Sequence, residues 1–301
     1  MTRSAETDPL VKPRLVAALS DVVAQASHRI LTVLGSGLAT RLKQDSSPVT
    51  NVDEAAEAAL LEGLARLLPG VPVVSEESVD PSLSVTRLGS AFVLVDPLDG
   101  TRELVAGRDE YTVNLAVIVD RRPVLGFVAA PSAHLLWRGA IGLGAEKLRI
   151  GMSEGSAKAV DARKITSRHW PAQNPIALVS RSHPDARTAA LLDALPVSSR
   201  ESCGSSLKFC RLAEGTADFY PRLSPISEWD IAAGHAVLAA AGGTLLAADG
   251  ATLTYGHASG AFLVPPFIAL GDPAAAPSVL ATAAKIPTPP LPAAAARRGQ
   301  E

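Results

Sequence analysis

The stretch Val95–Leu104, VDPLDGTREL, decides how the sequence is interpreted, because it places two carboxylates at the exit of an apolar run. That run, AFVLV, has the composition of a buried strand. Asp96 and Asp99 are separated by a proline and a leucine, and the rigid proline turns the chain so that both side chains can face one point. The carbonyl group of Leu98 can point there as well. The stretch therefore predicts a cluster of oxygen ligands at a strand end.

The next two residues add a second kind of binding group. Gly100 and Thr101 offer backbone N–H groups at the expected start of a helix, which is a favourable place for a phosphate group. Metal-binding oxygens and anion-binding amides would then lie together within a few residues of the chain. Taken alone the pattern is weak, because acids after strands are common in loops and Asp99 could simply cap the helix.

Further acidic residues follow other predicted elements. Glu76 and Glu77 come after the apolar run VPVV, and Asp230 opens the apolar stretch WDIAAGHA. Asp45 and Asp53 flank the segment SSPVT. Buried carboxylates repel one another, so several of them come together only where cations neutralise them. Hard oxygen ligands favour Mg²⁺ or Mn²⁺, and the sequence has no histidine pair or cysteine set suited to a softer metal.

The composition argues against several classes of partner. With 301 residues and 47% hydrophobic content, the chain can bury a large core in one large or two ordinary domains. A formal net charge of -2 and an aromatic content of 4% give no reason to expect nucleic acid or an acidic membrane surface as a partner. Cys203 and Cys210 are too few for a disulfide framework. We expect them to be reduced and to pack as small hydrophobes.

No segment predicts secretion or insertion into a membrane. The first residues, MTRSAETDPLVKPRL, lack the apolar core of a signal peptide. The longest apolar stretch, 231–248, is split by Gly242 and Gly243 into a helix and a strand, so it does not predict a membrane span. We therefore expect a cytoplasmic protein without a transmembrane segment.

The apolar periodicity predicts an α/β protein, with α+β organisation in the N-terminal half and α/β organisation in the C-terminal half. Amphipathic helices are expected over 15–34 and 53–68, with a loop between them. An antiparallel hairpin is expected over 111–131. The other expected strands and helices are 71–78, 91–100, 175–180, 187–195, a helix-to-strand crossing over 211–222, 229–243 and 244–249.

The same patterns divide the chain into three parts. Residues 1–160 are expected to form an α+β subdomain with the metal and phosphate site. Residues 161–272 are expected to form an α/β subdomain with the substrate-recognition residues. Residues 273–301 are rich in Ala and Pro, and we expect a mobile tail because this composition does not bury a core.

Several long motifs resemble those of the inositol monophosphatase superfamily of magnesium-dependent, lithium-sensitive phosphatases. DPLDGT, the upstream SEES and WDIAAGHAVLAAAGG are similar to the signature motifs of the superfamily. Within it, KQDSSPVTNVD, VDPLDGTRELVAGRDEYTVNLAVI, VSRSHPD and GSSLKFCRLAEGTADFYPR resemble the CysQ-type 3'(2'),5'-bisphosphate nucleotidases. The resemblance runs from about Leu15 to Leu270, and it implies a layered αβαβα sandwich.

The resemblance also implies roles for individual residues around a metal site. Two or three Mg²⁺ ions would be bound, with Mn²⁺ as an alternative, and the implied ligands are Glu76, Asp96, the Leu98 carbonyl, Asp99 and Asp230. Gly100 and Thr101 would hold the scissile phosphate. Asp53 would pair with the Thr101 hydroxyl to orient the attacking water, so that Asp53, Glu76 and Thr101 are the implied catalytic residues. Thr50, Asp45 and Lys43 would lie on a loop that closes over the site.

The implied substrate pocket lies in the second half of the chain. Ser205, Lys208 and Arg222 would line it together with His183, and the two cationic side chains could meet a 5'-phosphate. Without the resemblance, Lys208 and Arg222 would be interpreted as solvated charges and His183 as a loop residue. The complete implied substrate-binding set is Glu76, Leu98, Asp99, Gly100, Thr101, His183, Ser205, Lys208, Arg222 and Asp230.

The implied reaction is hydrolysis of the 3'-phosphate of 3'-phosphoadenosine 5'-phosphate, to give AMP and phosphate. The same chemistry on an inositol phosphate, on fructose 1,6-bisphosphate or on 3'-phosphoadenylyl sulfate stays open. A regulatory binding role with a secondary phosphatase site is a third interpretation, although a silent site has no need of so many mutually repelling acids. Lithium inhibition and a loose association with the inner membrane face are implied by the resemblance alone. The sequence leaves the oligomeric state open.

Overall fold

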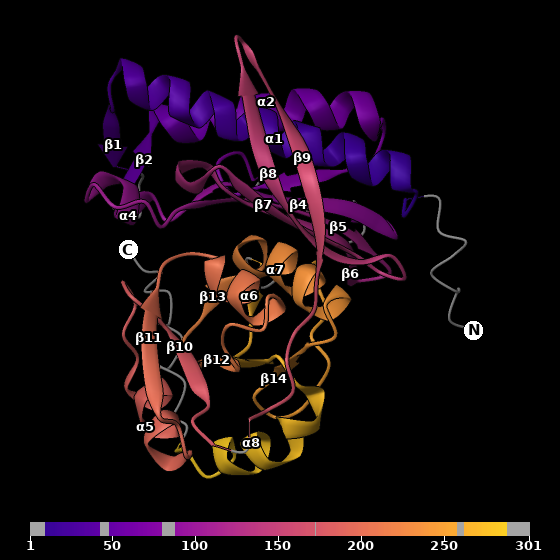
Figure 1. Cartoon of the computed structure of the whole chain (residues 1–301). Coiled ribbons are helices and arrows are strands. Elements are labelled where there is room, and N and C mark those ends of the chain that lie inside the picture. Colours follow the sequence, from indigo (N-terminus) through magenta and orange to yellow (C-terminus); the bar gives the residue numbers. More distant parts are fainter. Residues whose placement is uncertain (1–9, 43–47, 80–87, 172, 258–261, 288–301) are drawn as a thin grey trace, which may run out of the picture.

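The computed structural model describes residues 10–42, 48–79, 88–171, 173–257 and 262–287, and these residues form stacked layers of helices and sheets (Figure 1). Two long helices cover the outer face of a large sheet, two shorter helices lie between this sheet and a smaller one, and two more close the far end. These pairs are α1 (Pro13–Ser36) and α2 (Asn51–Leu67), α6 (Leu207–Ala213) and α7 (Glu228–Ala240), and α5 (Ala186–Ala194) and α8 (Ala276–Ala283). The expected αβαβα sandwich is confirmed.

Seven strands form the large sheet, in the order β3-β4-β5-β6-β7-β8-β9. The first pair, β3 with β4, is parallel, and all later neighbours pair antiparallel. The parallel pair brings the ends of two neighbouring strands to the same edge, which matters for the site described below. The strands are β3 (Val73–Ser75), β4 (Ala91–Asp99), β5 (Thr112–Val119), β6 (Arg122–Ala130), β7 (Leu135–Ala140), β8 (Gly144–Ser153) and β9 (Ser156–Ile165).

Both faces of the large sheet are covered, which explains the continuous apolar run that leads to Asp96. In β4, Val93 and Val95 pack in the core under α1 and α2, whereas Phe92 and Leu94 pack in the core on the side of α7. Successive side chains of a strand point to opposite faces, so a strand between two cores is apolar at every position. The expected buried strand is confirmed.

Two glycines in the large sheet let α7 approach its backbone closely. A Cβ atom on Gly126 of β6 would lie 2.2 Å from the carbonyl oxygen of Ala233, and one on Gly139 of β7 would lie 2.5 Å from the Cα atom of Val237. No side chain fits in this space. Because Asp230 lies in the first turn of α7, this close packing also fixes the position of the Asp230 carboxylate.

The small sheet has the order β11-β10-β12-β16-β14, in which β10 is parallel to β11 and β12, and β16 is antiparallel to β12 and β14. Its strands are β10 (Ile176–Ser180), β11 (Ser199–Cys203), β12 (Phe219–Arg222), β14 (Thr244–Ala247) and β16 (Phe267–Leu270). The remaining short elements are β1 (Thr40–Leu42), β2 (Pro48–Thr50), α4 (Thr101–Val105), η2 (Pro131–Ala133), β13 (Ile226–Ser227), β15 (Leu263–Val264) and η4 (Pro273–Ala275).

Two expectations about organisation need correction. The segment between the first two helices, expected to be a loop, contains the antiparallel pair β1 and β2. The structure also shows no break at residue 160, because β9 continues to Ile165 and pairs with β8 up to that residue. The two halves share one core, in which Leu94 and Val128 of the large sheet pack with Phe209 and Val237 from the middle helices.

The tail begins later than residue 273. η4 and α8 follow directly on the small sheet, and Ala275, Ala276, Val279 and Ala283 are buried against it. These residues recur three or four positions apart, so they form one apolar helix face. The Ala and Pro content alone does not reveal this face, so the boundary expected at residue 273 lies too early in the chain. The rest of the expected tail, 288–301, lies outside the described residues.

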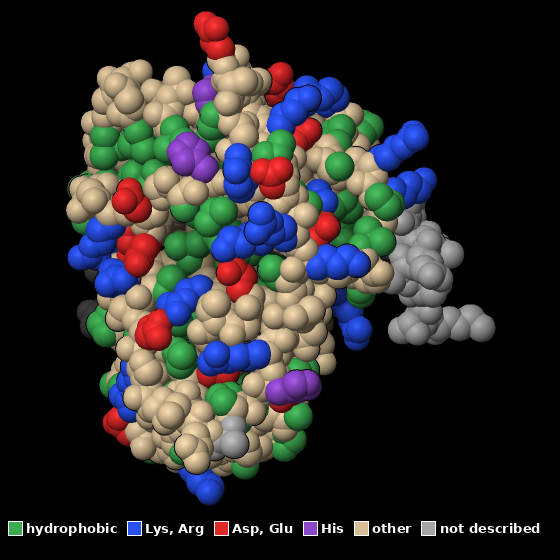
Figure 2. All heavy atoms as spheres, viewed as in Figure 1, with side chains coloured by type: hydrophobic (Ala, Val, Ile, Leu, Met, Phe, Trp, Pro, Cys, Tyr) green, Lys and Arg blue, Asp and Glu red, His purple; other side chains and the backbone are tan. Residues whose placement is uncertain are grey.

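The outer surface has no strongly one-sided charge on the face shown in Figure 2, where acidic and basic side chains are interspersed. Over the described part of the chain, no helix combines the length and the apolar character that crossing a bilayer requires. Cys203 and Cys210 are both free and buried, as expected.

Candidate metal and phosphate site

A cavity of about 370 Å³ lies between the exits of β3 and β4, the start of α7 and the end of the small sheet. Its lining brings together residues that are far apart in the sequence. The sequence-predicted residues that line it are Glu76, Asp96, Leu98, Asp99, Gly100, Thr101, His183, Ser205, Lys208, Arg222 and Asp230. Asp53 lies behind this lining, in hydrogen-bond contact with Thr101. Lys43 and Asp45 fall outside the described residues.

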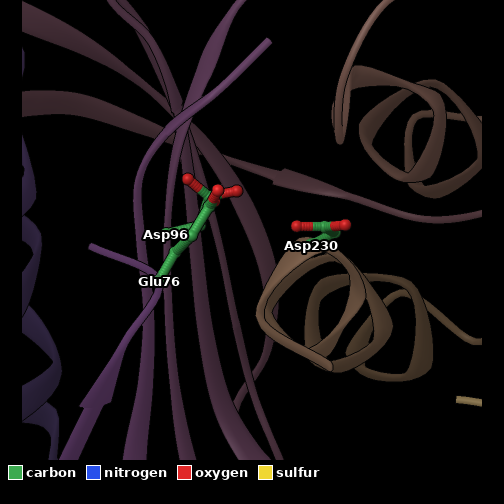
Figure 3. A group of neighbouring side chains, drawn as sticks. All are labelled: Glu76, Asp96 and Asp230. Carbon is green, nitrogen blue, oxygen red and sulfur yellow. The ribbon is translucent and has the colours of Figure 1, made fainter. Parts of the chain in front are cut away.

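Three carboxylates converge at one end of the cavity (Figure 3). Each of Glu76, Asp96 and Asp230 offers one oxygen atom, and these three atoms all lie within 4.8 Å of one another. Figure 3 shows Glu76 and Asp96 side by side on the large sheet, with Asp230 facing them from the start of α7. The parallel pairing of β3 and β4 explains why Glu76 lies beside Asp96. The Glu76 N–H donates to the carbonyl of Val95, the residue before Asp96, at 3.1 Å.

The Asp96 carboxylate is held at one oxygen and left without a partner at the other. Its Oδ1 accepts a hydrogen bond of 3.0 Å from the Leu98 N–H, whereas its buried Oδ2 has no hydrogen-bond partner among the described residues. Burial raises the pKa of Asp96 well above the usual value, and the charges of Glu76, Asp99 and Asp230 raise it further. An orphaned carboxylate oxygen among like charges is costly unless a cation binds it. The donor set therefore fits a hard divalent ion.

Asp230 has the same electrostatic character. Burial raises its pKa well above the usual value, and Asp99 and Glu76 raise it further. Its Oδ2 accepts a hydrogen bond of 3.3 Å from the Ser227 N–H in the capping box that begins α7. The helix start therefore fixes the carboxylate that faces the large sheet.

Asp99, the other predicted acidic ligand, is not part of the group of three carboxylates. It lines the same cavity, and its Oδ2 lies 3.4 Å from both Thr112 Oγ1 and Asn114 Nδ2. Burial raises the pKa of Asp99, and the positive charge of Lys208 opposes that shift. The strand register shifts between Asp96 and Asp99, and such an irregularity changes the direction in which side chains point.

The predicted pair of Asp53 and Thr101 is present beside the carboxylates. Thr101 Oγ1 lies 3.2 Å from Asp53 Oδ1 and 3.1 Å from the Leu98 carbonyl oxygen, so its single proton can go to either acceptor. Asp53 also accepts from the Thr50 N–H and hydroxyl, at 2.8 and 2.6 Å, in the capping box of α2. Burial raises the pKa of Asp53, and its hydrogen bonds, first of all that from the Thr50 side chain, oppose the shift.

Gly100 forms the turn between β4 and α4. Its φ of 100° lies in the left-handed region, which side chains with a Cβ atom disfavour. A Cβ atom there would also lie 3.1 Å from the Glu110 carbonyl oxygen. Glycine is therefore required at the position whose N–H is expected to meet a phosphate.

Lys208 and Arg222 supply positive charge to the lining of the same cavity. Lys208 is buried, and its ammonium group donates to the carbonyl oxygens of Cys203 and Ser205 at 3.0 and 2.6 Å and lies 5.1 Å from the centre of the Tyr220 ring. The interpretation of Lys208 as a solvated surface charge is therefore wrong. Arg222 donates to the Pro225 carbonyl at 3.3 Å, and its buried Nε has no partner.

His183 lies between the cavity and a neighbouring hollow of about 510 Å³. Burial lowers the pKa of His183, and the positive charges of Arg222 and Arg102 lower it further. The imidazole is therefore neutral at pH 7.

Several residues outside the predicted set hold the site in place. Glu228 is fully buried and accepts hydrogen bonds from the N–H groups of Gly256 and His257 at 2.6 and 2.8 Å, which anchors the start of α7. Asn114 Nδ2 donates to Ser206 Oγ at 3.0 Å, and that hydroxyl donates to the Asp230 carbonyl at 2.6 Å. The signal for Asn114 was available, because it is the polar residue within the apolar strand TVNLAVIV.

The layered fold and the acidic cluster between its sheets define a metal-dependent phosphatase. The model of the inositol monophosphatase family matches residues 12–284. The chain belongs to this family.

Relatives within the family are similar over most of the chain. The chain is 43% identical over 213 residues to the 3'(2'),5'-bisphosphate nucleotidase CysQ of Salmonella typhimurium, which covers 71% of this chain and 81% of that protein. It is 33% identical over 248 residues to the CysQ of Buchnera aphidicola, with coverage of 82% and 89%. The crystal structure of CysQ from Bacteroides thetaiotaomicron superposes with a TM-score of 0.69 at 31% identity, over 87% of this chain and 98% of that one.

Proposed function

We propose that this chain is a Mg²⁺-dependent 3'(2'),5'-bisphosphate nucleotidase, which hydrolyses 3'-phosphoadenosine 5'-phosphate to AMP and phosphate. The observation that carries the proposal is the cavity whose lining combines an unpartnered Asp96 oxygen and two further carboxylates with the cations Lys208 and Arg222. A phosphate ester with a second anionic group matches such a lining, because a cation among the carboxylates and the two cationic side chains can each meet a phosphate. The similarity to proteins named CysQ supports the same substrate.

Glu76, Asp96 and Asp230 would hold the cation, with Asp99 and the Leu98 carbonyl as further ligands. Bound Mg²⁺ supplies a water of lowered pKa and neutralises charge on the phosphoryl oxygens. The raised pKa values of Asp96 and Asp230 support this assignment, because a nearby cation is what would keep these carboxylates ionised.

Asp53 and Thr101 would orient the water that attacks phosphorus. When the Thr101 hydroxyl donates its proton to Asp53, its lone pairs remain free to accept a hydrogen bond from that water. The N–H groups of Gly100 and Thr101 would hold the phosphoryl oxygens, where negative charge builds up during the attack. Glu76 directly follows β3 and would help Asp53 and Thr101 to position the water.

Lys208, Arg222, Ser205 and His183 would bind the rest of the substrate. An ammonium group has three donors, and Lys208 uses two of them on backbone carbonyls, so one remains for an anion. The unpartnered Arg222 Nε and Ser205 Oγ add two polar groups around the same space. The neutral imidazole of His183 would contact the nucleoside. The buried, free cysteines support a reducing compartment, and we place the enzyme in the cytoplasm.

The experiment that tests this function is phosphate release from a panel of esters, with and without Mg²⁺. The panel contains 3'-phosphoadenosine 5'-phosphate, inositol 1-phosphate and fructose 1,6-bisphosphate. Metal-dependent release from the nucleotide alone supports the whole proposal. Preference for another ester would keep the metal site and reject the nucleotide pocket. No release from any ester would favour a regulatory binding role.

A further inference from the structure

Glu110 contacts both sides of the proposed site, although the proposed mechanism gives it no role. It precedes β5, and its carbonyl oxygen packs against Gly100, at 3.1 Å from where a Cβ atom of that glycine would lie. Its side chain reaches the other half of the molecule, where Oε2 accepts a hydrogen bond of 2.8 Å from the Gly204 N–H. One residue therefore touches the turn after β4 and the turn after β11.

Arg181 holds the Glu110 side chain in this position. Its Nε donates to Oε2 and its Nη2 to Oε1, both at 2.8 Å, and Nη2 also donates to the Ser202 carbonyl at 3.0 Å. The two side chains are 35% and 32% exposed, and a simple ion pair at that exposure contributes little. The two-bond geometry and the additional backbone contacts make this pair specific. Burial alone would raise the pKa of Glu110, but the hydrogen bonds from Arg181 and Gly204 outweigh it and lower that pKa.

The chain segment that this pair holds is the turn that presents Ser205 and Lys208 to the cavity. A Cβ atom on Gly204 would lie 2.7 Å from the Glu110 carbonyl oxygen, so the two backbones are in close contact. Ser205 has a φ of 42°, a strained value for a residue with a side chain, which persists only where surrounding contacts impose it. Its carbonyl oxygen accepts from Lys208, and its buried hydroxyl has no partner.

We propose that Glu110 and Arg181 are positioning residues, which set the segment 204–208, the turn before α6 and the first residues of that helix, for the part of the substrate that is remote from the scissile phosphate. The inference rests on the proposed function, in which Ser205 and Lys208 bind that part. The pair touches no reacting atom and acts through the Gly204 N–H. Its loss should therefore weaken the use of a bisphosphate substrate much more than that of a small ester without a second phosphate.

The test compares kcat/KM for 3'-phosphoadenosine 5'-phosphate with kcat/KM for para-nitrophenyl phosphate in the full chain with Mg²⁺. In Glu110→Ala we expect the ratio of the two values to fall by about tenfold or more, the size of one lost charge-assisted contact, mainly through KM for the bisphosphate. Glu146→Ala is the matched control, because Glu146 is 30% exposed, accepts a hydrogen bond of 2.8 Å from Arg138 Nε and forms an ion pair of 2.7 Å with Arg138 Nη2, away from the cavity lining. Its ratio should match that of the unaltered protein. Glu110→Gln serves as the milder variant if alanine impairs folding.

A charge-swapped double variant, Glu110→Arg with Arg181→Glu, separates positioning from simple charge pairing. The swap restores the ion pair but leaves no acceptor at position 110 for the Gly204 N–H, so we expect no rescue of the ratio. Rescue by the swap would overturn the proposal, as would an unchanged ratio in both Glu110 variants.

Amide hydrogen exchange of the segment 204–208 keeps the inference independent of the substrate assignment. We expect faster exchange at Gly204 in Glu110→Ala than in Glu146→Ala, and equal exchange would overturn the positioning role. If the unaltered protein fails to hydrolyse 3'-phosphoadenosine 5'-phosphate, the proposed function is rejected before any variant is made. Exchange at Gly204 then decides on the positioning pair by itself.

Discussion

At the scale of single residues, the site is built from groups that are unfavourable for the folded chain on its own. The clearest is Asp96, which has a buried oxygen without a partner and a pKa raised first by burial and then by neighbouring acids. Such a group opposes folding at neutral pH, and it is tolerated where function requires it. Stability and metal binding should therefore change in opposite directions when it is altered.

Asp96→Asn should stabilise the metal-free protein and abolish turnover. The amide has no charge to repel Glu76 and Asp230, and it can still accept the bond from the Leu98 N–H. We expect a gain of about 1–3 kcal/mol in the free energy of unfolding at pH 7, the usual cost of one unsatisfied buried polar atom. The measurement is urea unfolding with a chelator present.

The pH dependence of this gain provides its control. The folded pKa of Asp96 lies above the usual 3.8, so the wild-type residue loses stability as the pH rises through that folded value. The advantage of asparagine should therefore be largest at neutral pH and vanish near pH 4. A variant that is less stable than the wild type at every pH would contradict the assignment of charge repulsion at this position.

His235 makes a second residue-scale prediction, away from the metal site. Its Nδ1 lies 2.8 Å from the Tyr255 hydroxyl, and burial lowers its pKa from 6.5 to about 4. Between pH 6.5 and about 4, His235 is protonated in the unfolded chain and neutral in the folded chain. The free energy of unfolding therefore falls as the pH drops from 6.5 to about 4. Relative to His235→Gln, the wild type should lose at most about 1.4 kcal/mol per pH unit in this window. If the free energy of unfolding changed with pH by the same amount in both proteins between pH 6.5 and 4, the prediction would be wrong.

At the scale of elements, the position of α7 on the large sheet controls the metal site. Gly139→Ala would place a Cβ atom 2.5 Å from the Val237 Cα, and a helix backbone cannot move aside as a flexible side chain can. We expect a loss of about 1–3 kcal/mol in stability from overpacking. We also expect weaker Mg²⁺ binding in calorimetry, because α7 carries Asp230. Gly35→Ala is the control, since nothing lies within 4 Å of that position in α1.

The elements also show what could be predicted from the sequence and what could not. The strand β4, whose apolar run leads to Asp96, was predictable because alternate residues face two cores, and both long helices followed from their periodicity. The β8–β9 hairpin was missed because much of β9 is exposed and carries charges such as Lys158, Arg163 and Lys164 in place of an apolar alternation. The start of α8 was missed because alanine looks neutral in a composition count.

In the site too, contacts within one short motif could be predicted from the sequence, whereas contacts between distant segments could not. Asp96, Leu98, Asp99, Gly100 and Thr101 share one short motif, so their proximity was predictable. The contact of Glu110 with Gly204 joins residues 94 positions apart, and that of Asn114 with Ser206 joins residues 92 positions apart. Ser206 continues this second connection to Asp230. Only the order of the strands and the layering of α7 on the sheet bring these groups together.

At the scale of the whole molecule, the two halves share a core and should unfold together. Residues of the large sheet and of α6 and α7 belong to one cluster, so neither half can expose its side of the cluster without exposing the other. We expect a single transition in scanning calorimetry, with matching enthalpies from the peak area and from its shape. Two resolved transitions would mean that the halves are independent domains.

The three carboxylates of Glu76, Asp96 and Asp230 come from two layers of the fold. Glu76 and Asp96 lie at the large sheet, and Asp230 lies in the helix layer beneath it. A cation bound among these three carboxylates would hold the two layers together, and local opening between the layers would require release of the cation. Resistance to proteases would then follow the supply of free divalent ions, so that a cell short of them would clear this protein sooner.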